Sequence, residues 1–543
     1  MRGLMMDYQL TIPTILRRAE TLFGNKEIIS RLPDKSIHRY TYRDFGLRVR
    51  KLSAALSFLG VKEGDKVATF CWNHYQHLEA YFALPCMGSI IHTLNIRLSA
   101  DDLAYIVNHA HDKIIVVDQV LLPLFEKFKQ NIKVEKVIVI RQSDQAINPE
   151  YLDYEKVVAS GVASDFQPFE GDENTAASMC YTSGTTGKPK GVLYSHRSIM
   201  LHSMSCLVSC CGLGIIEHDV VLPIVPMFHA SAWGFPFNST FVGATQVFPG
   251  PHLDAENLCD LYVNEKVTVT AGVPTVMVGV LNRLDANPEK YTLSLRVILM
   301  GGSSVPRFLI KAFDERYNIT VLQGWGMTET SPLGSTAPIT SQLVNASKEE
   351  RYDYQAKQGL PAPFVEIRGR NESGLIPWNG STMGELEVRG PWISSAYYDD
   401  SEPAGKFTDD GWFKTGDIVT IDPHGCIEVK DRSKDVIKSG GEWISSVALE
   451  NTLMGHPSVL EAAVVGIPDS KWMERPFAYV VFKDGKSSLA DELNKFLETK
   501  FPKFWLPEGY SFVPAIPKTS VGKFLKSALR EKYAKEILEA GVS

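Results

Sequence analysis

The chain has 543 residues, which is too long for one compact hydrophobic core and therefore predicts several domains or subdomains. Its 44% hydrophobic and 22% charged residues are typical of a globular protein, and a net charge of −7 argues against a nucleic-acid binder. No apolar run reaches the roughly 18 residues that span a bilayer, and the N-terminus lacks the apolar core of a secretory signal.

Eight cysteines are scattered along the chain, and no two of them form a Cys-x-x-Cys pair. This spacing favours reduced thiols in a cytoplasmic protein over disulfides or a zinc site.

The first 170 residues alternate helical and strand patterns. Thr41 to Asp44 resembles a capping box, and it opens an amphipathic helix that ends at Gly60. We expect strands at residues 66–70, 89–93, 113–118 and 134–140. Short apolar strands that alternate with helices indicate a parallel α/β sheet.

The same alternation continues to about residue 350. The expected strands are 220–225, 244–248, 267–271, 295–300 and 320–323. Polar or glycine-rich clusters follow three of them directly, at 226–229, 301–304 and 323–330. Because ligands bind at the carboxyl ends of strands in open α/β sheets, these clusters predict a binding site.

The alternation of helical and strand patterns ends at about residue 355. Glycine and proline separate short β-like runs at 364–368, 384–389, 418–421 and 426–429, which predicts a small β-barrel subdomain. A charge cluster at 431–435 then marks a domain boundary. We therefore predict an N-terminal core, 1–433, with two α/β subdomains (about 1–170 and 171–350) and a barrel (351–430). A small, mobile α+β domain would follow at 434–543, with strands at 462–465 and 477–482 and helices at 489–501 and 524–540.

A loop at residues 181–191 combines glycines, hydroxyls and lysines after an uncharged run that is typical of a buried strand. Glycines let backbone N–H groups turn toward an anion, hydroxyls donate further hydrogen bonds, and lysines neutralise charge. The loop does not fit the Walker A pattern. Taken alone it could be a flexible surface loop, but with the other clusters it favours phosphate binding.

Five motifs follow one another along the chain: 181–191, 323–330, Thr415-Gly416-Asp417, 431–442 and 517–523. In this order they resemble the adenylate-forming superfamily of acyl-CoA synthetases, nonribosomal adenylation domains and luciferases, over nearly the whole chain. The resemblance implies that a carboxylate attacks the α-phosphate of ATP to give an acyl-adenylate and pyrophosphate. A thiol then displaces AMP.

The resemblance also implies a set of ATP contacts, since a site that joins two anions must supply positive charge and oriented donors. The phosphate loop would contribute Thr182, Ser183, Gly184, Thr185, Thr186, Gly187 and Lys190. Thr185 and Glu329 would hold Mg²⁺, which prefers oxygen ligands, and Thr328 would donate to the α-phosphate. The alternative for Glu329 is a solvated surface acid.

The nucleoside would be held by a second group of residues. Asp417 would accept the ribose hydroxyls, with Arg432 as a further contact, although Asp417 alone could be a turn-capping acid. The adenine slot would be lined by Gly301, Gly302, Ser303, Gln323, Gly324 and Trp325.

Lys523 matches the lysine that bridges the attacking carboxylate and the α-phosphate in this superfamily, although most lysines are merely surface residues. In the superfamily the small domain rotates between the half-reactions. Lys434 matches the hinge and is a candidate AMP contact. The thiol side would be formed by Lys438, Gly440, Gly441, Glu442 and Trp443.

The chain ends soon after Lys523, which favours free coenzyme A over a tethered phosphopantetheine. The runs 226–234 and 439–457 resemble the medium- and long-chain acyl-CoA synthetase branch. There His229 would lie between the nucleotide and acyl sites, and Trp233 matches an acyl-pocket gate, with core packing as an equal alternative. The acyl site would comprise Ala230, Ser231, Trp233, Gly302 and Trp325.

Within this branch the chain is most similar to the 3-methylmercaptopropionate-CoA ligases. We therefore expect 3-(methylthio)propanoate or a similar short or medium acid as the substrate, with medium- and long-chain fatty acids as the alternative. The resemblance also implies a homodimer.

Three rival interpretations remain open. A kinase or ATPase would release ADP in place of AMP and pyrophosphate. A non-catalytic nucleotide-binding protein would not need Glu329, Asp417, Arg432 and Lys523. A luciferase-like oxygenase shares the fold, but nothing in the sequence calls for oxygen chemistry.

Overall fold

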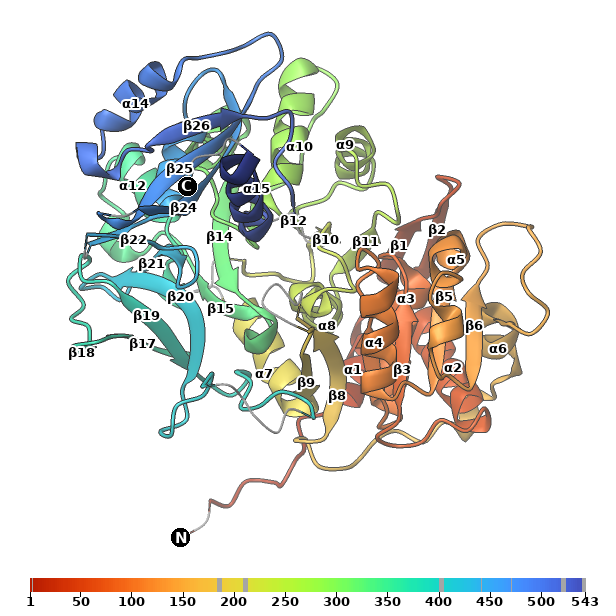
Figure 1. Ribbon diagram of the computed structural model, residues 1–543. Coiled ribbons are helices and arrows are strands. Elements are labelled where there is room, and N and C mark those ends of the chain that lie inside the picture. The colour runs from red at the N-terminus through yellow and green to blue at the C-terminus, as the bar shows by residue number, and fades with distance from the viewer. Residues whose placement is uncertain are drawn as a thin grey trace.

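The structure is a computed structural model that describes residues 1, 3–182, 188–208, 213–399, 405–440, 442–469, 471–518 and 524–539. Four β-sheets organise these residues. In Figure 1 the two large sheets of the N-terminal part lie at the right and centre, and the blue C-terminal segment packs above β14 and β20.

A seven-stranded sheet contains the first predicted strands, and its strands pair in parallel except at β9. Its inner strand β5 is buried along its whole length, as expected for a sheet covered on both faces. The strand order is β7 (Leu152–Asp153), β6 (Lys136–Ile140), β5 (Ile114–Asp118), β3 (Lys66–Phe70), β4 (Ile90–Thr93), β8 (Ala176–Tyr181), β9 (Gly191–Ser195).

A nine-stranded sheet lies beside it and has parallel strands in its middle and antiparallel strands at both ends. Four parallel strands, β10, β12, β13 and β14, end at the candidate site described below. The order is β16 (Leu360–Pro361), β15 (Leu333–Thr336), β14 (Thr320–Gly326), β13 (Val297–Met300), β12 (Val269–Gly272), β10 (Val220–Pro223), β11 (Thr245–Phe248), β1 (Glu27–Arg31), β2 (Ile37–Thr41).

The expected division near residue 170 does not separate these two sheets. β1 and β2, from the start of the chain, join the nine-stranded sheet, where Ile29 pairs with Val247. β8 and β9, from beyond residue 170, join the seven-stranded sheet, where Thr93 pairs with Cys180. Hydrophobic periodicity predicts where strands lie but carries no information on which distant strand each one joins.

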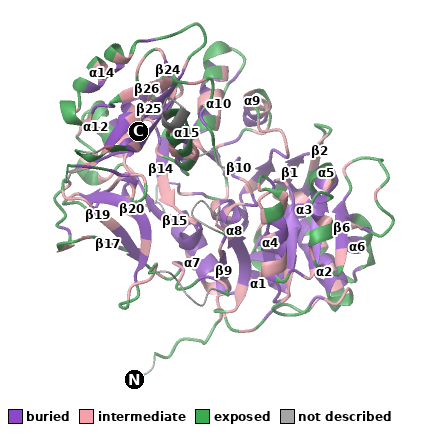
Figure 2. Ribbon diagram, in the orientation of Figure 1, coloured by how far each residue is buried: buried purple, intermediate pink, exposed green. Residues whose placement is uncertain are grey.

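Helices cover the faces of both large sheets, and Figure 2 shows buried sheets beside exposed outer helix faces. The predicted capping box is confirmed, since Thr41 N–H donates to Asp44 and Asp44 N–H donates to the Thr41 hydroxyl. The helices are α1 (Ile12–Phe23), α2 (Tyr42–Phe58), α3 (Tyr75–Cys86), α4 (Ala100–Ala110), α5 (Leu122–Phe125), α6 (Tyr154–Ser160), α7 (His196–Leu207), α8 (Phe235–Val242), α9 (Ala255–Asn264), α10 (Pro274–Ala286), α11 (Arg307–Tyr317) and α12 (Lys348–Gln355). Within the described ranges no helix has the length and apolar character to cross a bilayer.

A five-stranded antiparallel sheet follows, as the short β-like runs separated by glycine and proline predicted. Its order is β18 (Gly374–Leu375), β17 (Glu366–Asn371), β19 (Gly384–Arg389), β20 (Phe413–Ile421), β21 (Ile427–Arg432). Among the described residues no strand pair joins β18 to β21, so the sheet has two open ends and the expected closed barrel is not confirmed.

The C-terminal segment has its own sheet and core, with the α+β character predicted. Two long strands, β24 (Val459–Asp469) and β25 (Met473–Phe482), pair antiparallel and extend well beyond the predicted ranges. Around them lie β22 (Ile437–Ser439), β23 (Glu442–Ile444), β26 (Gly509–Phe512), α13 (Ser446–Met454), α14 (Ala490–Glu498) and α15 (Lys526–Glu539).

Candidate active site

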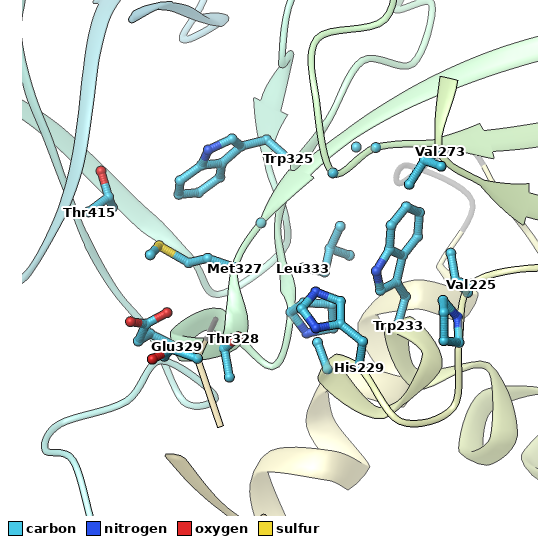
Figure 3. Close-up of a pocket in the computed structure, with 18 of the residues that line it drawn as sticks. Val225, His229, Trp233, Val273, Trp325, Met327, Thr328, Glu329, Leu333 and Thr415 are labelled. Atoms are coloured by element: carbon cyan, nitrogen blue, oxygen red, sulfur yellow. The ribbon is translucent and has the colours of Figure 1, made fainter. Parts of the chain in front are cut away.

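A cavity of about 780 Å³ lies where the carboxyl ends of the central strands face the five-stranded sheet and the C-terminal segment. Figure 3 shows Trp325, Met327 and Thr415 on one side of it and Trp233, Val273 and Val225 on the other. The first side is rich in polar groups and the second is apolar. The lining therefore suits a ligand with one polar and one apolar part.

Asp417 is held in a fixed position next to the polar edge, but it is not itself part of the cavity lining. It is buried on β20, directly opposite Arg432 on β21, and the Arg432 Nε lies 2.9 Å from its Oδ1. The indole Nε1 of Trp325 donates to its Oδ2 at 2.9 Å. Thr415 and Gly416 line the cavity next to it, and Gly416 has φ +74°, a conformation that favours glycine. The predicted ribose-binding residues therefore form one connected group.

Glu329 lies in a short 3-10 turn, Thr328–Thr330, directly after β14. The turn is pinned because Tyr194 donates its hydroxyl to the Thr328 carbonyl at 2.8 Å. The Tyr397 hydroxyl donates to Glu329 Oε1 at 2.7 Å, and the Lys190 Nζ lies 4.8 Å from the centroid of the Tyr397 ring. A buried carboxylate with lone pairs left over, in the same cavity as Lys190, suits a magnesium phosphate, because Mg²⁺ prefers oxygen ligands.

Trp233 lies on the opposite side, in the short turn Ala230–Gly234. Ala230 to Trp233 all have positive φ, between 42° and 55°. Each such residue costs about 1–2 kcal/mol, so the surrounding structure must stabilise the turn.

The indole of Trp233 packs against the glycine pair that follows β13. A Cβ on Gly301 would lie 2.7 Å from the Gly324 carbonyl oxygen and 3.2 Å from the Trp233 ring. Gly302 has φ +80° and lies under the same ring. These glycines are needed because backbone and indole approach closely here, so the predicted adenine loop also forms a wall of the apolar side.

Besides Asp417, three predicted contact residues do not line the cavity. Gln323 is 1% exposed, and its Oε1 accepts the Val305 N–H at 3.1 Å, so it braces the 301–305 loop from behind. Ser303 is exposed and is not part of the lining, and Ser231 is buried against β8, 3.5 Å from the Ser178 hydroxyl. Strand alternation and turn direction decide which of several adjacent polar residues faces a ligand, and motif position alone does not.

Several predicted residues lie outside the described part of the chain: Ser183, Gly184, Thr185, Thr186, Gly187, Gly441, Lys523 and the side chain of Glu442. Their neighbours Thr182, Lys190 and Phe524 line the cavity. Phe524 pairs with Lys518 in a short antiparallel bridge. The end of the chain that carries the predicted catalytic lysine therefore approaches the cavity.

The predicted thiol-side residues occupy the hairpin β22–β23. Lys438, Gly440 and Trp443 do not line the cavity, and the Gly440 N–H donates to the Trp472 carbonyl at 2.8 Å. In this arrangement the segment that carries Phe524 approaches the cavity and the hairpin does not.

Comparison with known proteins identifies the family. A family model described as AMP-binding enzyme matches residues 16–398, and one described as AMP-binding enzyme C-terminal domain matches residues 448–523. The chain belongs to the AMP-binding enzyme family. It has the adenylate-forming fold, as the order of the sequence motifs predicted.

Relatives of this AMP-binding enzyme cover almost its full length. A long-chain-fatty-acid–CoA ligase of Thermus thermophilus is 48% identical over 97% of this chain and 96% of the relative. A 3-methylmercaptopropionyl-CoA ligase of Ruegeria lacuscaerulensis is 38% identical over 98% and 99%. The solved structure of the anthranilate CoA ligase AuaEII in complex with anthranoyl-AMP matches with a TM-score of 0.87, at 25% identity and full coverage of both chains.

Sequence reasoning missed several residues that line the cavity of this AMP-binding enzyme, among them Arg97, Tyr105, His109, Tyr397, Tyr398 and Lys406. The run Tyr397-Tyr398-Asp399 between two predicted strands was the available signal. Arg97 lies between β4 and α4, and His109 lies on α4. No local sequence pattern links either residue to the phosphate loop.

Lys434 lines the cavity beside Arg432. Partial burial lowers the pKa of Lys434, with added repulsion from Arg432, Arg530 and Lys406, while Asp435 opposes the shift. Several cations therefore converge on the end of the cavity nearest the predicted hinge.

Proposed function

We propose that the protein is an AMP-forming acyl-CoA ligase, which converts a carboxylic acid and ATP to an acyl-adenylate and pyrophosphate, and then to acyl-CoA and AMP. The observation that carries this proposal is the single cavity in which Arg432, paired with the buried Asp417, and Glu329 lie across from the apolar wall at Trp233. An acid and a nucleotide bound there would meet at its centre.

In the first half-reaction Asp417 would accept the ribose hydroxyls, and the glycines at 301–302 would let adenine lie against backbone. Glu329 and Thr185 would hold Mg²⁺, which would neutralise phosphate charge when bound. Thr328 and Lys190 would orient the phosphates so that the carboxylate and the α-phosphorus are close.

Lys523 would act at the reacting centre by screening the repulsion between the carboxylate and the α-phosphate. Lys523→Ala should abolish adenylate formation but spare thioester formation from acyl-adenylate that is made beforehand. The second half-reaction would follow rotation about Lys434, which would bring the β22–β23 hairpin to the cavity.

For the acid we propose an unbranched aliphatic substrate, with medium- and long-chain fatty acids as the first candidates. The apolar wall supports this, since Val225, Val273 and Leu333 surround Trp233, as does the 48% identity to a long-chain ligase. 3-(Methylthio)propanoate is the second candidate, supported by the 38% identical relative. The comparison of kcat/KM across acids from propanoate to palmitate, including 3-(methylthio)propanoate, decides between them.

Product analysis tests the reaction class. With ATP, Mg²⁺, coenzyme A and a suitable acid, we expect AMP and pyrophosphate, and hydroxylamine should trap an acyl hydroxamate. Release of ADP would identify a kinase or ATPase and overturn the proposal.

We further propose that the protein forms a homodimer, as the family resemblance implies. Light scattering at micromolar concentration tests this assembly, and a monomer mass would exclude it.

A further inference from the structure

Two basic side chains on one face of α15 reach the segment on which the predicted hinge lies. Lys526 and Arg530 are four residues apart, so they lie one above the other on the same side of the helix. Neither residue belongs to the sequence motifs assigned above. Arg530 contacts the short segment 431–435, which ends the five-stranded sheet and contains Lys434, and Lys526 is linked to the same segment through Ser446.

Lys526 is the inner contact, and it is only 9% exposed. Its Nζ lies 2.7 Å from Glu450 Oε1 and donates to the Ser446 hydroxyl at 2.5 Å. Ser446 in turn donates both its N–H and its hydroxyl to Asp431 Oδ2, at 2.6 and 2.5 Å. A continuous chain of hydrogen bonds thus links α15 to α13 and to the last strand of the five-stranded sheet.

The groups in this chain are buried, because Asp431 is 1% and Glu450 is 5% exposed. Buried charges are destabilising unless they are paired, and separating such a pair leaves an uncompensated charge. The contacts between Lys526, Ser446 and Asp431 are therefore strong only when α15 and α13 lie against the end of β21 as they do in this structure.

Arg530 is the outer contact, at the other end of the same segment. Its guanidinium forms an ion pair with Asp435 and donates to the Lys434 carbonyl at 3.2 Å. Arg530 therefore holds one side of Lys434 directly, and Lys526 holds the other side, at Asp431, through Ser446.

We propose that Lys526 and Arg530 form a hinge clamp that holds Lys523 in the position required for adenylate formation. Lys526 follows Lys523 by three residues, so fixing the start of α15 against Asp431 limits where Lys523 can lie. This proposal rests on the proposed function, because it concerns the first of the two half-reactions. Both are positioning residues, since neither lines the cavity.

A conformational role and a purely structural role predict different results. If the clamp selects the arrangement for adenylate formation, its loss slows that step and leaves the thioester step intact. If the contacts only stabilise the C-terminal segment, both steps decline together.

Arg530→Ala and Lys526→Met test this on the full-length protein, with Lys532→Ala as the matched control. Lys532 lies on the same helix and pairs with Glu536 at 3.7 Å, away from the hinge. Pyrophosphate release in a single turnover should fall on the order of tenfold in Arg530→Ala and further in Lys526→Met. Formation of acyl-CoA from acyl-adenylate made beforehand should change less than about twofold in both, and Lys532→Ala should match the wild type in both steps.

A second readout is independent of catalysis. Trypsin can cleave after Lys430, Lys434 and Lys438, and opening of the clamp should accelerate cleavage there in both variants without substrate. Arg530 is partly exposed, so Arg530→Ala decides the question if Lys526→Met does not fold. Equal loss of both half-reactions, or unchanged pyrophosphate release with an unchanged cleavage rate, overturns the clamp. A wild type that releases no pyrophosphate instead overturns the proposed function, and cleavage still tests the clamp.

Discussion

Trp325 donates its indole N–H to the Asp417 carboxylate across the cavity edge, at 2.9 Å. The bond joins β14 of the nine-stranded sheet to β20 of the five-stranded sheet. The residue predicted to border adenine therefore orients the residue predicted to bind the ribose. Arg432 holds the other carboxylate oxygen at 2.9 Å.

We predict that Asp417→Asn weakens ATP binding much more than Trp325→Phe. The asparagine loses the charge opposite Arg432 and one of the acceptors that a ribose diol needs. Loss of such a buried, charge-assisted bond costs about 1–3 kcal/mol, so KM for ATP should rise roughly 5- to 150-fold.

Trp325→Phe is the comparison, because it keeps an aromatic ring but removes the N–H together with one ring of the indole. It leaves the carboxylate paired with Arg432, and KM for ATP should rise only a few-fold. KM for the acid should be nearly unchanged in Asp417→Asn. A larger effect of Trp325→Phe than of Asp417→Asn would contradict the assignment of the ribose contact to Asp417.

The second prediction concerns Tyr397, whose hydroxyl donates to Glu329 at 2.7 Å. Tyr397→Phe removes that bond but keeps the ring that Lys190 contacts. Partners that orient a metal-binding carboxylate commonly contribute 10- to 100-fold, so the Mg²⁺ concentration for half-maximal pyrophosphate release should rise about tenfold. Tyr398→Phe, at the adjacent position, should leave the Mg²⁺ requirement unchanged. If both variants changed the Mg²⁺ requirement equally, the proposal that Tyr397 orients the metal-binding carboxylate of Glu329 would be wrong.

The elements that could be predicted from sequence were those with a local signal. The strands β3 and β19 and the capping box at Thr41 occur where hydrophobic alternation and turn residues placed them. Gly301, Gly302 and the residues from Gly324 to Glu329, in the clusters after β13 and β14, also line the cavity. These features depend on neighbouring residues, which one sequence displays directly.

What could not be predicted depends on distant partners. The pairing of Ile29 with Val247 places the start of the chain in the second sheet, and no local pattern encodes it. Gln323 belongs to a recognisable motif, yet its side chain faces Val305 and not the cavity. Tyr397 was missed because its role depends on Glu329, 68 residues earlier in the chain.

The third prediction concerns Trp233, which packs against Gly301 and Gly302 at the apolar wall. Trp233→Ala should enlarge this side and shift the preference toward bulkier or longer acids. A change in apolar contact of one methylene is worth about 1–3 kcal/mol, so the kcat/KM ratio of a long to a short acid should rise at least about tenfold. KM for ATP should stay within about threefold of the wild type.

Trp378→Ala is the control, since Trp378 is 45% exposed in the loop between β18 and β19. It should leave the preference among acids unchanged. An unchanged preference in Trp233→Ala would favour the alternative that Trp233 is only a packing residue.

The last prediction concerns the acid sensitivity of the fold. His202 is buried beside the cavity, where its Nε2 accepts the Leu333 N–H at 3.3 Å, and burial lowers the pKa of His202 to about 4. Above pH 6.5 the residue is neutral in both the folded and the unfolded state. As the pH falls from 6.5 toward 4, the unfolded state takes up a proton and the folded state does not, so the free energy of unfolding decreases.

Between pH 7 and pH 5 this one residue should reduce the free energy of unfolding by about 2 kcal/mol. In His202→Gln the loss over that interval, measured by urea unfolding, should be smaller than in the wild type by about this amount, because glutamine does not titrate. His218 is exposed, and His218→Gln should show the full loss of the wild type. The same loss in His202→Gln as in the wild type would show that His202 does not carry the acid sensitivity.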